Sequence, residues 1–395
     1  MVRRLPIYWP PEDVRDSHAS NIVPLRGSGF SNSNTRNNDI PGVDAESIRK
    51  GLVSIIKAVD QKKLPGPLHP SVQSLQHLLE GDARLMSLCT SMLQESRPSK
   101  EDAEPHLYIR DYKHLLRLLD HVIARIPFYE ETAIVGLAPI RVTLDAELRT
   151  TSGYWFFIDE RVNLVMKDIT NAYGQLLTSL ASCVVLGREK SEMFGPSALH
   201  AVMRTASCGD TTFESRKFED VFVCNPQKEW HGFQSWDDWF TRRYRPGVRP
   251  VEGPHDDSVV INACEASPYC VETNVAFHCR YWAKGDAYSL LELFDGDVSM
   301  ADEFEGGTIM QAFLSALSYH RWHAPCSGTI VKVQKIQGTY YSEPLRESGE
   351  APNGHPGVNQ VYLAMRNTRT NVYIQAPGVV GLMCLMFIGE SRLPP

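Results

Sequence analysis

The sequence lacks an excess of basic residues. Its 395 residues include 40 lysines and arginines against 47 aspartates and glutamates, which gives a formal net charge of −7. Domains that bind nucleic acid usually carry a basic patch or stripe, so the charge balance predicts no nucleic-acid partner. Hydrophobic residues make up 43% of the chain and charged residues 22%, as in soluble globular proteins. The length is sufficient for two domains with separate cores.

Cysteine is present, but not in the patterns that bind metals or build a disulfide framework. The nine cysteines are scattered, odd in number and without a Cys-x-x-Cys pair: Cys89, Cys183, Cys208, Cys224, Cys264, Cys270, Cys279, Cys326 and Cys384. Zinc sites use closely spaced pairs, and small disulfide scaffolds use an even number of cysteines. We therefore predict reduced thiols, a cytoplasmic location and no metal site.

Long apolar runs are also missing. A transmembrane helix needs about 20 predominantly apolar residues, whereas the longest apolar run, residues 379–389, is about half that length. Residues 1–11 are interrupted by arginines and prolines and contain no apolar core of the kind found in secretory signals. We therefore predict no membrane span and no secretory signal.

The first half of the chain has the periodicity of helices. Residues 1–43 are polar and rich in Gly, Ser and Asn, which predicts a disordered arm. From Asp44, a good N-cap residue, apolar residues fall on one helical face as far as Val59. Further helices are predicted at 72–88 with a break at Gly81, at 115–126 before Pro127, and at 164–186. We assign residues 44–190 to a helical N-terminal domain.

The second half of the chain shows the shorter period of strands. Short β-branched segments predict strands at 308–314, 329–336, 361–363, 372–374 and 379–388. Residues 341–360 are rich in proline and glycine, which predicts a surface loop. The predicted fold class is therefore α+β, with the helical domain followed by a β-rich domain at residues 210–395.

Four short motifs occur in this second half. They are an arginine-rich motif, Gly-Phe-Gln-Ser-Trp-Asp-Asp-Trp-Phe-Thr-Arg-Arg-Tyr-Arg-Pro-Gly-Val-Arg-Pro (232–250), an acidic motif, Ile-Asn-Ala-Cys-Glu-Ala (261–266), a lysine motif, Lys-Gly-Asp-Ala-Tyr-Ser-Leu (284–290), and a histidine motif, Ser-Tyr-His-Arg-Trp-His-Ala-Pro (318–325). In order and spacing they resemble the phosphatidylserine decarboxylase family, and within it a soluble fungal branch like tryptophan decarboxylase. The resemblance covers residues 45–389.

The resemblance implies a fold and a cofactor. It implies a β-rich catalytic domain preceded by a helical domain, and a pyruvoyl group that the family makes by cleaving its own chain at a serine. Removing CO2 from an amino acid leaves negative charge at Cα, and a pyruvoyl carbonyl supplies the electron sink that no side chain can offer. Lys284 is an alternative as a pyridoxal phosphate lysine, but no glycine-rich phosphate cradle lies near it.

Three residues carry the chemistry that the resemblance implies. By motif position, His323 resembles the base that activates the serine, and Glu265, which stands where the family ordinarily has aspartate, resembles the carboxylate that orients this base. His320 resembles the histidine of the decarboxylation step, which places the substrate carboxylate or returns a proton to Cα. No cofactor-binding residue is assigned, because the pyruvoyl-forming serine is missing.

The spacing of the histidines leaves two geometries open. In an extended segment residues 320 and 323 would point to opposite faces, whereas a turn at 319–323 would let both reach one cavity. The nearby Pro325 favours the turn.

Other reactive or charged residues have plainer interpretations. A set of four arginines could serve as a nucleic-acid patch, but the acidic balance of the chain favours a structural role or pairing with carboxylates: Arg242, Arg243, Arg245 and Arg249. Cys264 is interpreted as a small buried thiol rather than a nucleophile.

The pyruvoyl-forming serine is not found where the resemblance would place it. In the family this serine has a Leu-Gly-Ser-Thr or Gly-Gly-Ser-Ser setting, downstream of the histidines. Gly27-Ser28 is the only Gly-Ser pair in the sequence and lies far upstream of them. We therefore expect a chain that is truncated at its C-terminus relative to the family and that, as given, does not form the group.

Three functions follow from these observations. The leading one is pyruvoyl-type decarboxylation of a free amino acid in fungal secondary metabolism, with aromatic amino acids as first candidates. A small-molecule substrate is favoured because no membrane anchor is visible. The alternatives are a catalytically inactive homologue that acts as a binding protein, or pseudoenzyme, and a phosphatidylserine decarboxylase of phospholipid synthesis.

Overall fold

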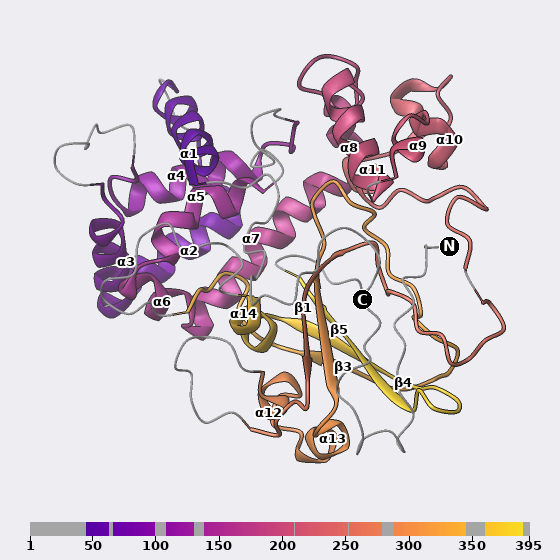
Figure 1. The fold of residues 1–395 in the computed structure, drawn as a ribbon. Helices are drawn as coiled ribbons and strands as arrows, with labels where there is room; N and C mark the ends of the chain where they lie inside the picture. Colours follow the sequence, from indigo (N-terminus) through magenta and orange to yellow (C-terminus); the bar gives the residue numbers. More distant parts are fainter. Residues whose placement is uncertain are drawn as a thin grey trace.

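The computed structural model describes residues 45–62, 66–98, 108–129, 138–208, 210–251, 253–278, 288–344 and 360–389. Helices make up the first half of the chain and two small antiparallel sheets lie in the second (Figure 1). The fold is therefore α+β, as the sequence predicts. The predicted arm at residues 1–43 and the expected N-cap Asp44 lie outside the described residues.

The described part of the chain contains helices and strands with the following bounds. The helices are α1 (Ala45–Asp60), α2 (Pro70–Gly81), α3 (Ala83–Glu95), α4 (Tyr112–Ile123), α5 (Pro139–Leu148), α6 (Thr151–Phe157), α7 (Glu160–Thr178), η3 (Leu180–Val185), α8 (Pro196–Ser207), α9 (Thr211–Glu214), α10 (Phe218–Val221), η4 (Glu229–Gly232), α11 (Trp236–Phe240), α12 (Leu290–Leu293), α13 (Val298–Phe304) and α14 (Gln360–Arg366). The strands are β1 (Ser267–Thr273), β2 (Thr308–Phe313), β3 (Thr329–Ile336), β4 (Arg369–Gln375) and β5 (Leu382–Ile388).

The first three predicted helical regions lie where the apolar periodicity places them. The region from Asp44 is α1, the region at 72–88 is α2 and α3 with the break after Gly81, and the region at 115–126 is α4. Their apolar faces pack with α5, α6 and α7 into one buried cluster, which includes Ile56, Leu79 and Leu119. Burial of this face supplies most of the stability of such helices, so the predictions are confirmed.

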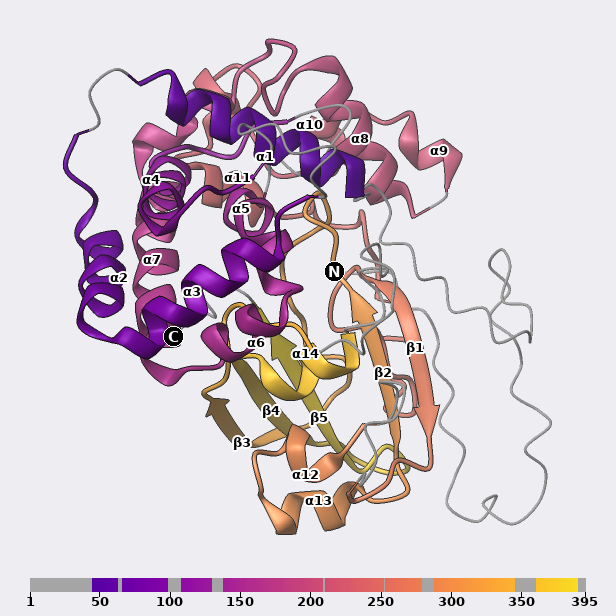
Figure 2. The same cartoon turned by 90° about the vertical axis from the view of Figure 1, so that its left-hand side faces the viewer.

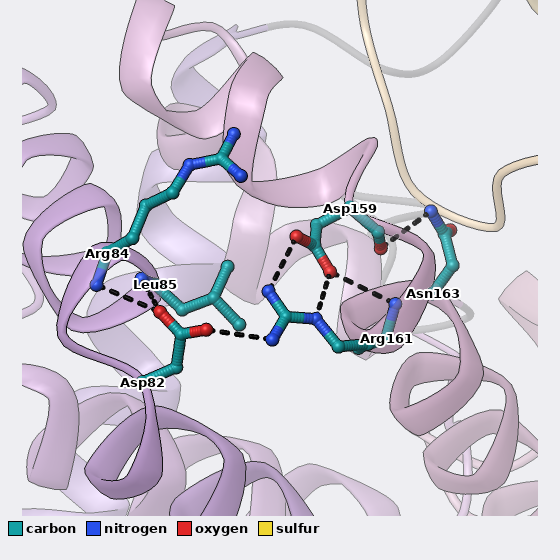
Figure 3. Close-up of polar contacts among 6 residues, drawn as sticks. All are labelled: Asp82, Arg84, Leu85, Asp159, Arg161 and Asn163. Carbon is teal, nitrogen blue, oxygen red and sulfur yellow. Dashed lines mark hydrogen bonds and ion pairs between the residues drawn. The ribbon is translucent and has the colours of Figure 1, made fainter.

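One arginine joins the N-termini of α3 and α7. Asp82 caps α3, because its Oδ1 accepts hydrogen bonds from the backbone N–H groups of Arg84 at 2.9 Å and Leu85 at 3.0 Å. Asp159 caps α7, and Arg161 donates from Nη1 to Asp82 at 2.7 Å and from Nε and Nη2 to Asp159 (Figure 3). Carboxylates accept hydrogen bonds from the free N–H groups of a helix N-terminus and interact favourably with the positive end of the helix dipole. The shared arginine therefore ties two stabilised helix starts together.

The fourth predicted helix is two elements rather than one. α7 ends at Thr178, and the 3-10 helix η3 follows after Ser179, whose backbone is extended at ψ 155°. The hydroxyl of Ser182 donates to the carbonyls of Leu177 at 2.9 Å and Ser179 at 2.6 Å. Serine side chains that bond the backbone compete with helical hydrogen bonds. The prediction of one helix over 164–186 therefore holds for 164–178, within α7, and was wrong at its C-terminal end.

The strands form two separate antiparallel sheets. β1 pairs with β2, while β3, β4 and β5 form a three-stranded sheet in that order. The central strand β4 buries Tyr373 and Ile374, whereas β3 exposes Ile330 and Val333. The strands predicted at 308–314, 329–336 and 372–374 are confirmed.

One predicted strand is a helix. Residues 361–363 lie in α14, which buries Val361, Tyr362, Ala364 and Met365. These positions follow the helical spacing of i, i+3 and i+4, but the apolar run visible in the sequence is too short to separate a strand from a helix. In both views α14 lies between the helices of the first half and the three-stranded sheet (Figures 1 and 2).

The region between β3 and β5 differs from the prediction in one further respect. β5 begins at Leu382 rather than at residue 379, directly after Gly381, whose φ of 66° interrupts the strand. Most of the predicted surface loop, residues 345–359, lies outside the described residues.

Residues 338–344 connect the sheet to the helical half. The N–H of Tyr340 donates to Oδ1 of Asn163 on α7 at 3.1 Å, and Arg141 on α5 forms an ion pair with Glu343. Tyr341 is buried in the helical cluster. The two halves thus share core contacts, and the domain bounds 44–190 and 210–395 stay a prediction.

Two predicted absences can be compared with the described part of the chain. Among its helices, none combines the length and the apolar character that crossing a membrane requires. The eight cysteines that it contains are all free thiols. Cys279 lies outside it.

Candidate active site

The acidic motif and the histidine motif pair along their backbones. The N–H of His323 donates to the carbonyl of Ala263 at 2.7 Å, and the N–H of Ile261 donates to the carbonyl of Pro325 at 2.8 Å. The two bonds hold the segments antiparallel, so Glu265, two residues after Ala263, lies close to the histidine motif. Residues far apart in the sequence therefore meet where the motifs predict a site.

The Glu265 carboxylate is held by side chains of the arginine-rich motif. Nε of Arg249 donates to Oε1 of Glu265 at 2.7 Å, and the hydroxyl of Tyr244 donates to Oε2. The thiol of Cys208 lies 3.5 Å from Oε1. Only 3% of the Arg249 side chain and 10% of the Glu265 side chain are exposed, so this is a buried ion pair.

Burial and charge shape the acid–base properties of this group. Burial opposes the charged form of Arg249, but the Glu265 carboxylate outweighs it and raises the pKa of Arg249. Burial, together with the negative charge of Glu265, raises the pKa of the Tyr244 hydroxyl. Arg249 also lies over the rings of Phe213 at 4.2 Å and Tyr244 at 4.8 Å. The guanidinium is therefore fixed on several sides and stays charged.

His323 has a buried nitrogen without a partner. Its ring is stacked on Tyr319, with centroids 5.5 Å apart and an interplanar angle of 6°. Within the described residues, Nε2 is buried and has no hydrogen-bond partner. Burial, together with the positive charge of Arg321, lowers the pKa of His323. A neutral imidazole with a free nitrogen has the properties of a general base.

Glu265 reaches His323 through two tyrosine rings. The described residues show no hydrogen bond between the two side chains. Instead, the ring of Tyr244, whose hydroxyl binds Glu265, packs on Tyr319 at 4.4 Å between centroids, and Tyr319 stacks on His323. The orienting contact predicted from the sequence stays a prediction, and the structure offers an indirect route for it.

His320 has different surroundings. Its ring stacks on Phe240 at 3.7 Å between centroids, and its Nε2 lies 2.9 Å from the carbonyl oxygen of Ser315. Because a carbonyl can only accept, Nε2 carries the proton. Burial, together with the positive charge of Arg242, lowers the pKa of His320 to about 4. The neutral ring therefore has its unprotonated nitrogen at Nδ1.

The predicted turn lies earlier in the chain. The N–H of Ser318 donates to the carbonyl of Ser315 at 2.9 Å, so the hydrogen-bonded turn is at 315–318. Residues 319–324 are assigned neither turn nor strand. The prediction of a turn at 319–323 was therefore wrong, although the segment bends enough to stack the rings of Tyr319 and His323. The two histidines lie against different aromatic rings.

Comparison with known proteins decides the family. Two family models, both described as phosphatidylserine decarboxylase, match residues 69–202 and 236–391. The decarboxylase iboD of Amanita muscaria is 37% identical over 265 residues, which are 64% of this chain and 73% of that protein. The chain belongs to the phosphatidylserine decarboxylase family.

Two further relatives are L-tryptophan decarboxylases. The enzyme of Psilocybe cubensis is 30% identical over 72% of this chain, and that of Psilocybe cyanescens is 32% identical over 65% of it. The chain spans 65% and 60% of the lengths of these two relatives. The resemblance inferred from the four motifs is thus confirmed, and the first family model places most of the helical half within the family as well.

The described end of the lysine motif, residues 288–290, packs apart from the other three motifs. Lys284 is outside the described residues. Tyr288 is buried, and its hydroxyl contacts Cys270 at 3.1 Å and Gln311. Tyr288 packs in the cluster of α12, α14 and the sheets, whereas Tyr244 and Tyr319 pack in the cluster of α8, α10 and α11. The described part of this motif supports the sheets rather than the histidines.

Sequence reasoning missed the partners of the predicted site residues. Arg249 pairs with Glu265, as the carboxylate-pairing interpretation of the arginines expects. Tyr244 was not singled out, and its only signal was its place in a family motif. Cys264 has its pKa raised to about 11 by burial, together with the charge of Glu265, and is therefore a protonated thiol. In the described ranges, no cluster of three or more His, Cys, Asp or Glu could hold a metal ion.

Proposed function

We propose that this protein decarboxylates a free amino acid, with aromatic amino acids as first candidates, and that it does so in the cytoplasm as part of fungal secondary metabolism. The observation that carries the proposal is the buried Nε2 of His323, which has no partner among the described residues and belongs to a ring whose pKa is lowered. Two relatives are named L-tryptophan decarboxylase, which supports a free aromatic amino acid over a phospholipid.

The cofactor of this family, a pyruvoyl group, would supply the electron sink for the charge left at Cα. The partnerless Nε2 of His323 fits the base that a serine hydroxyl requires. Residues 324–395 contain no Gly-Ser pair, so the serine in its family setting is not among them. We therefore assign His323 to serine activation.

Glu265 would orient His323 indirectly. Its carboxylate anchors the hydroxyl of Tyr244, and the rings of Tyr244 and Tyr319 then set the plane of the His323 ring. Orientation of the base is what the carboxylate of a catalytic triad provides. In this proposal two stacked rings replace the single hydrogen bond.

His320 would act on the substrate. Its Nε2–H donates to the carbonyl of Ser315. Its ring is neutral at cytoplasmic pH because its pKa is about 4. The remaining nitrogen, Nδ1, is then the atom that can receive or return a proton. Stacking on Phe240 keeps this nitrogen in one orientation.

The test is release of CO2 by a version that appends a family segment containing Gly-Gly-Ser-Ser after residue 389. We expect it to release CO2 from tryptophan, phenylalanine or tyrosine in buffer without detergent, and the same version with His323→Ala to release none. The unextended chain is the control and should migrate as one unprocessed band. If the extended version acts only on phosphatidylserine in vesicles, the protein belongs to phospholipid synthesis. If the extended version releases CO2 from none of these substrates, an inactive binding protein is favoured.

A further inference from the structure

Arg242 is a buried cation that has no acidic partner among the described residues. It is 1% exposed, and within the described part of the chain no carboxylate lies within ion-pair distance of it. Its Nη2 donates to the carbonyls of Leu317 at 2.6 Å and Ser318 at 3.2 Å. Its guanidinium lies over the rings of Phe222 at 4.7 Å and Trp239 at 5.0 Å. Backbone carbonyls and aromatic faces thus replace the usual counter-ion.

Such an arrangement needs a compensating gain, because burying an unpaired charge is costly. Burial lowers the pKa of Arg242 to about 10, so the side chain remains charged at neutral pH. Hydrogen bonds from a charged donor are among the strongest in proteins. The carbonyls that receive them, those of Leu317 and Ser318, lie three and two residues before His320, so these bonds stabilise the start of the histidine motif.

The contacts of Arg242 are the centre of a longer pairing between two segments. Phe240 stacks on His320 at 3.7 Å between centroids. Nε of Arg321 donates to the carbonyl of Thr241 at 2.6 Å. Together with the packing of Tyr244 on Tyr319, these contacts join residues 240–244 to residues 317–321. The arginine-rich motif therefore holds the first part of the histidine motif, as far as Arg321, and Arg242 donates to the backbone at the start of this part.

We propose that Arg242 is a positioning residue: its guanidinium holds the carbonyls of Leu317 and Ser318 and thereby fixes where the rings of His320 and His323 lie. The inference rests on the proposed function only for the roles of the two histidines. The described residues show no hydrogen bond or ring contact between Arg242 and either histidine ring, so its effect passes through the backbone and through its charge.

The charge of Arg242 also acts on His320. Among the described residues, the His320 ring contacts the Phe240 ring and the carbonyl of Ser315, and the Arg242 cation and the carbonyl of Ala316 also act on its pKa. Burial lowers the pKa of His320 most, Arg242 lowers it further, and the two carbonyls raise it. Removal of the Arg242 charge should therefore raise this pKa, but not to its ordinary value, because the burial remains.

Arg369 provides a matched control. It is 2% exposed and donates to four carbonyls, those of Glu292, Leu293, Met365 and Asn367. Like Arg242, it has no ion pair among the described residues and has its pKa lowered by burial. It lies in β4, where it contacts no residue of the histidine motif that the structure describes. Its loss should destabilise the fold in a similar way without moving the histidines.

The experiment compares Arg242→Met, Arg242→Lys and Arg369→Met in the 395-residue chain with two readouts. The first is NMR titration of histidine rings in selectively labelled protein, with the His320 signal assigned from His320→Gln. The second is hydrogen exchange of the Ser318 amide, which donates to the carbonyl of Ser315. Neither readout requires decarboxylation, so an inactive protein would overturn the proposed function and leave this inference standing.

We expect Arg242→Met to raise the pKa of His320. Arg242→Lys keeps the charge but cannot bridge two carbonyls with a planar fork, so it should leave that pKa close to its original value and speed exchange of the Ser318 amide about tenfold, as loss of a charged hydrogen bond predicts. Arg369→Met should change neither. An unmoved His320 titration in Arg242→Met, equal effects in Arg369→Met, or unchanged Ser318 exchange in Arg242→Lys would overturn the proposal. If Arg242→Met does not fold, the exchange measurement on Arg242→Lys decides.

Discussion

The ion pair between Arg249 and Glu265 predicts a large loss of stability when either partner is removed. Arg249→Met leaves the Glu265 carboxylate almost buried, with 10% of its side chain exposed, and without its cation. Removing one partner of a buried pair typically costs 3–5 kcal/mol. Because the hydroxyl of Tyr244 still donates to the carboxylate, we expect the low end of this range, about 3 kcal/mol.

The pairing itself can be separated from the loss of packing by a double-mutant cycle. Glu265→Gln keeps the shape of the side chain but leaves the Arg249 cation buried and unpaired. The variant that carries both substitutions leaves no uncompensated charge, so it should cost about 2 kcal/mol less than the sum of the single variants. Urea unfolding followed by tryptophan fluorescence measures these differences, because Trp236 and Trp239 lie in the same core cluster as Tyr244.

A second ion pair in the chain is the control for this experiment. Arg110 and Asp60 also form a hydrogen-bonded pair, with distances of 2.6 and 2.8 Å, but 37% and 35% of their side chains are exposed. Exposed pairs contribute only about 0–1 kcal/mol, so Arg110→Met should cost far less than Arg249→Met. The reasoning is refuted if the two substitutions cost the same, or if the effects of Arg249→Met and Glu265→Gln simply add.

Two further predictions concern titration and self-cleavage. Burial raises the pKa of Glu147, a 1% exposed residue, from 4.5 to about 7. The folded state therefore binds this proton more tightly than the unfolded state. The free energy of unfolding should fall by about 3 kcal/mol as the pH rises from below 4.5 to above about 7. Urea midpoints between pH 4 and 8 check this, and Glu147→Gln, which keeps an oxygen for the hydroxyl of Ser96, should remove the slope. In the version extended with Gly-Gly-Ser-Ser, His323→Ala should block self-cleavage, whereas His320→Ala should cleave and then decarboxylate slowly. A gel and a CO2 assay decide this, and cleavage that survives in His323→Ala would show that the two roles are reversed.

The helical half of the fold was predictable because its apolar residues repeat at helical spacing and these same residues are the ones that pack into the core. In α1 and α4 the apolar residues that define the helical face are the residues that become buried. The same reasoning fails for α14, because three apolar residues in a row carry no period. Its helical state is set by packing between the helices and the sheet, as in Figure 2, and by Arg369, which donates to the carbonyls of Met365 and Asn367 at its C-terminal end.

The candidate site was predictable in its motifs but not in its contacts. Family resemblance singled out Glu265, His320 and His323, and two backbone hydrogen bonds bring the acidic and histidine motifs together. The sequence indicated that the arginines pair with carboxylates, but not which residues contact each other, because the contacts join segments that are far apart in sequence. Arg242 and Leu317, for example, are separated by 75 positions. No local pattern in a single sequence encodes such a distance.

The two histidines differ in surroundings more than their spacing indicates, and this difference supports separate roles. His320 has one nitrogen committed to the Ser315 carbonyl, and a buried cation, Arg242, helps to keep its ring neutral. His323 has a buried nitrogen without a partner among the described residues, and its ring is linked through Tyr319 and Tyr244 to a carboxylate. When their environments give two titratable groups different pKa values, one can act as the acid and the other as the base. A nitrogen that is free and linked to a carboxylate suits serine activation, whereas a ring held in one tautomer suits a single proton position on the substrate. The arginine-rich motif contributes to both environments. Arg242 lowers the pKa of His320, and Tyr244 packs on Tyr319, which stacks on His323.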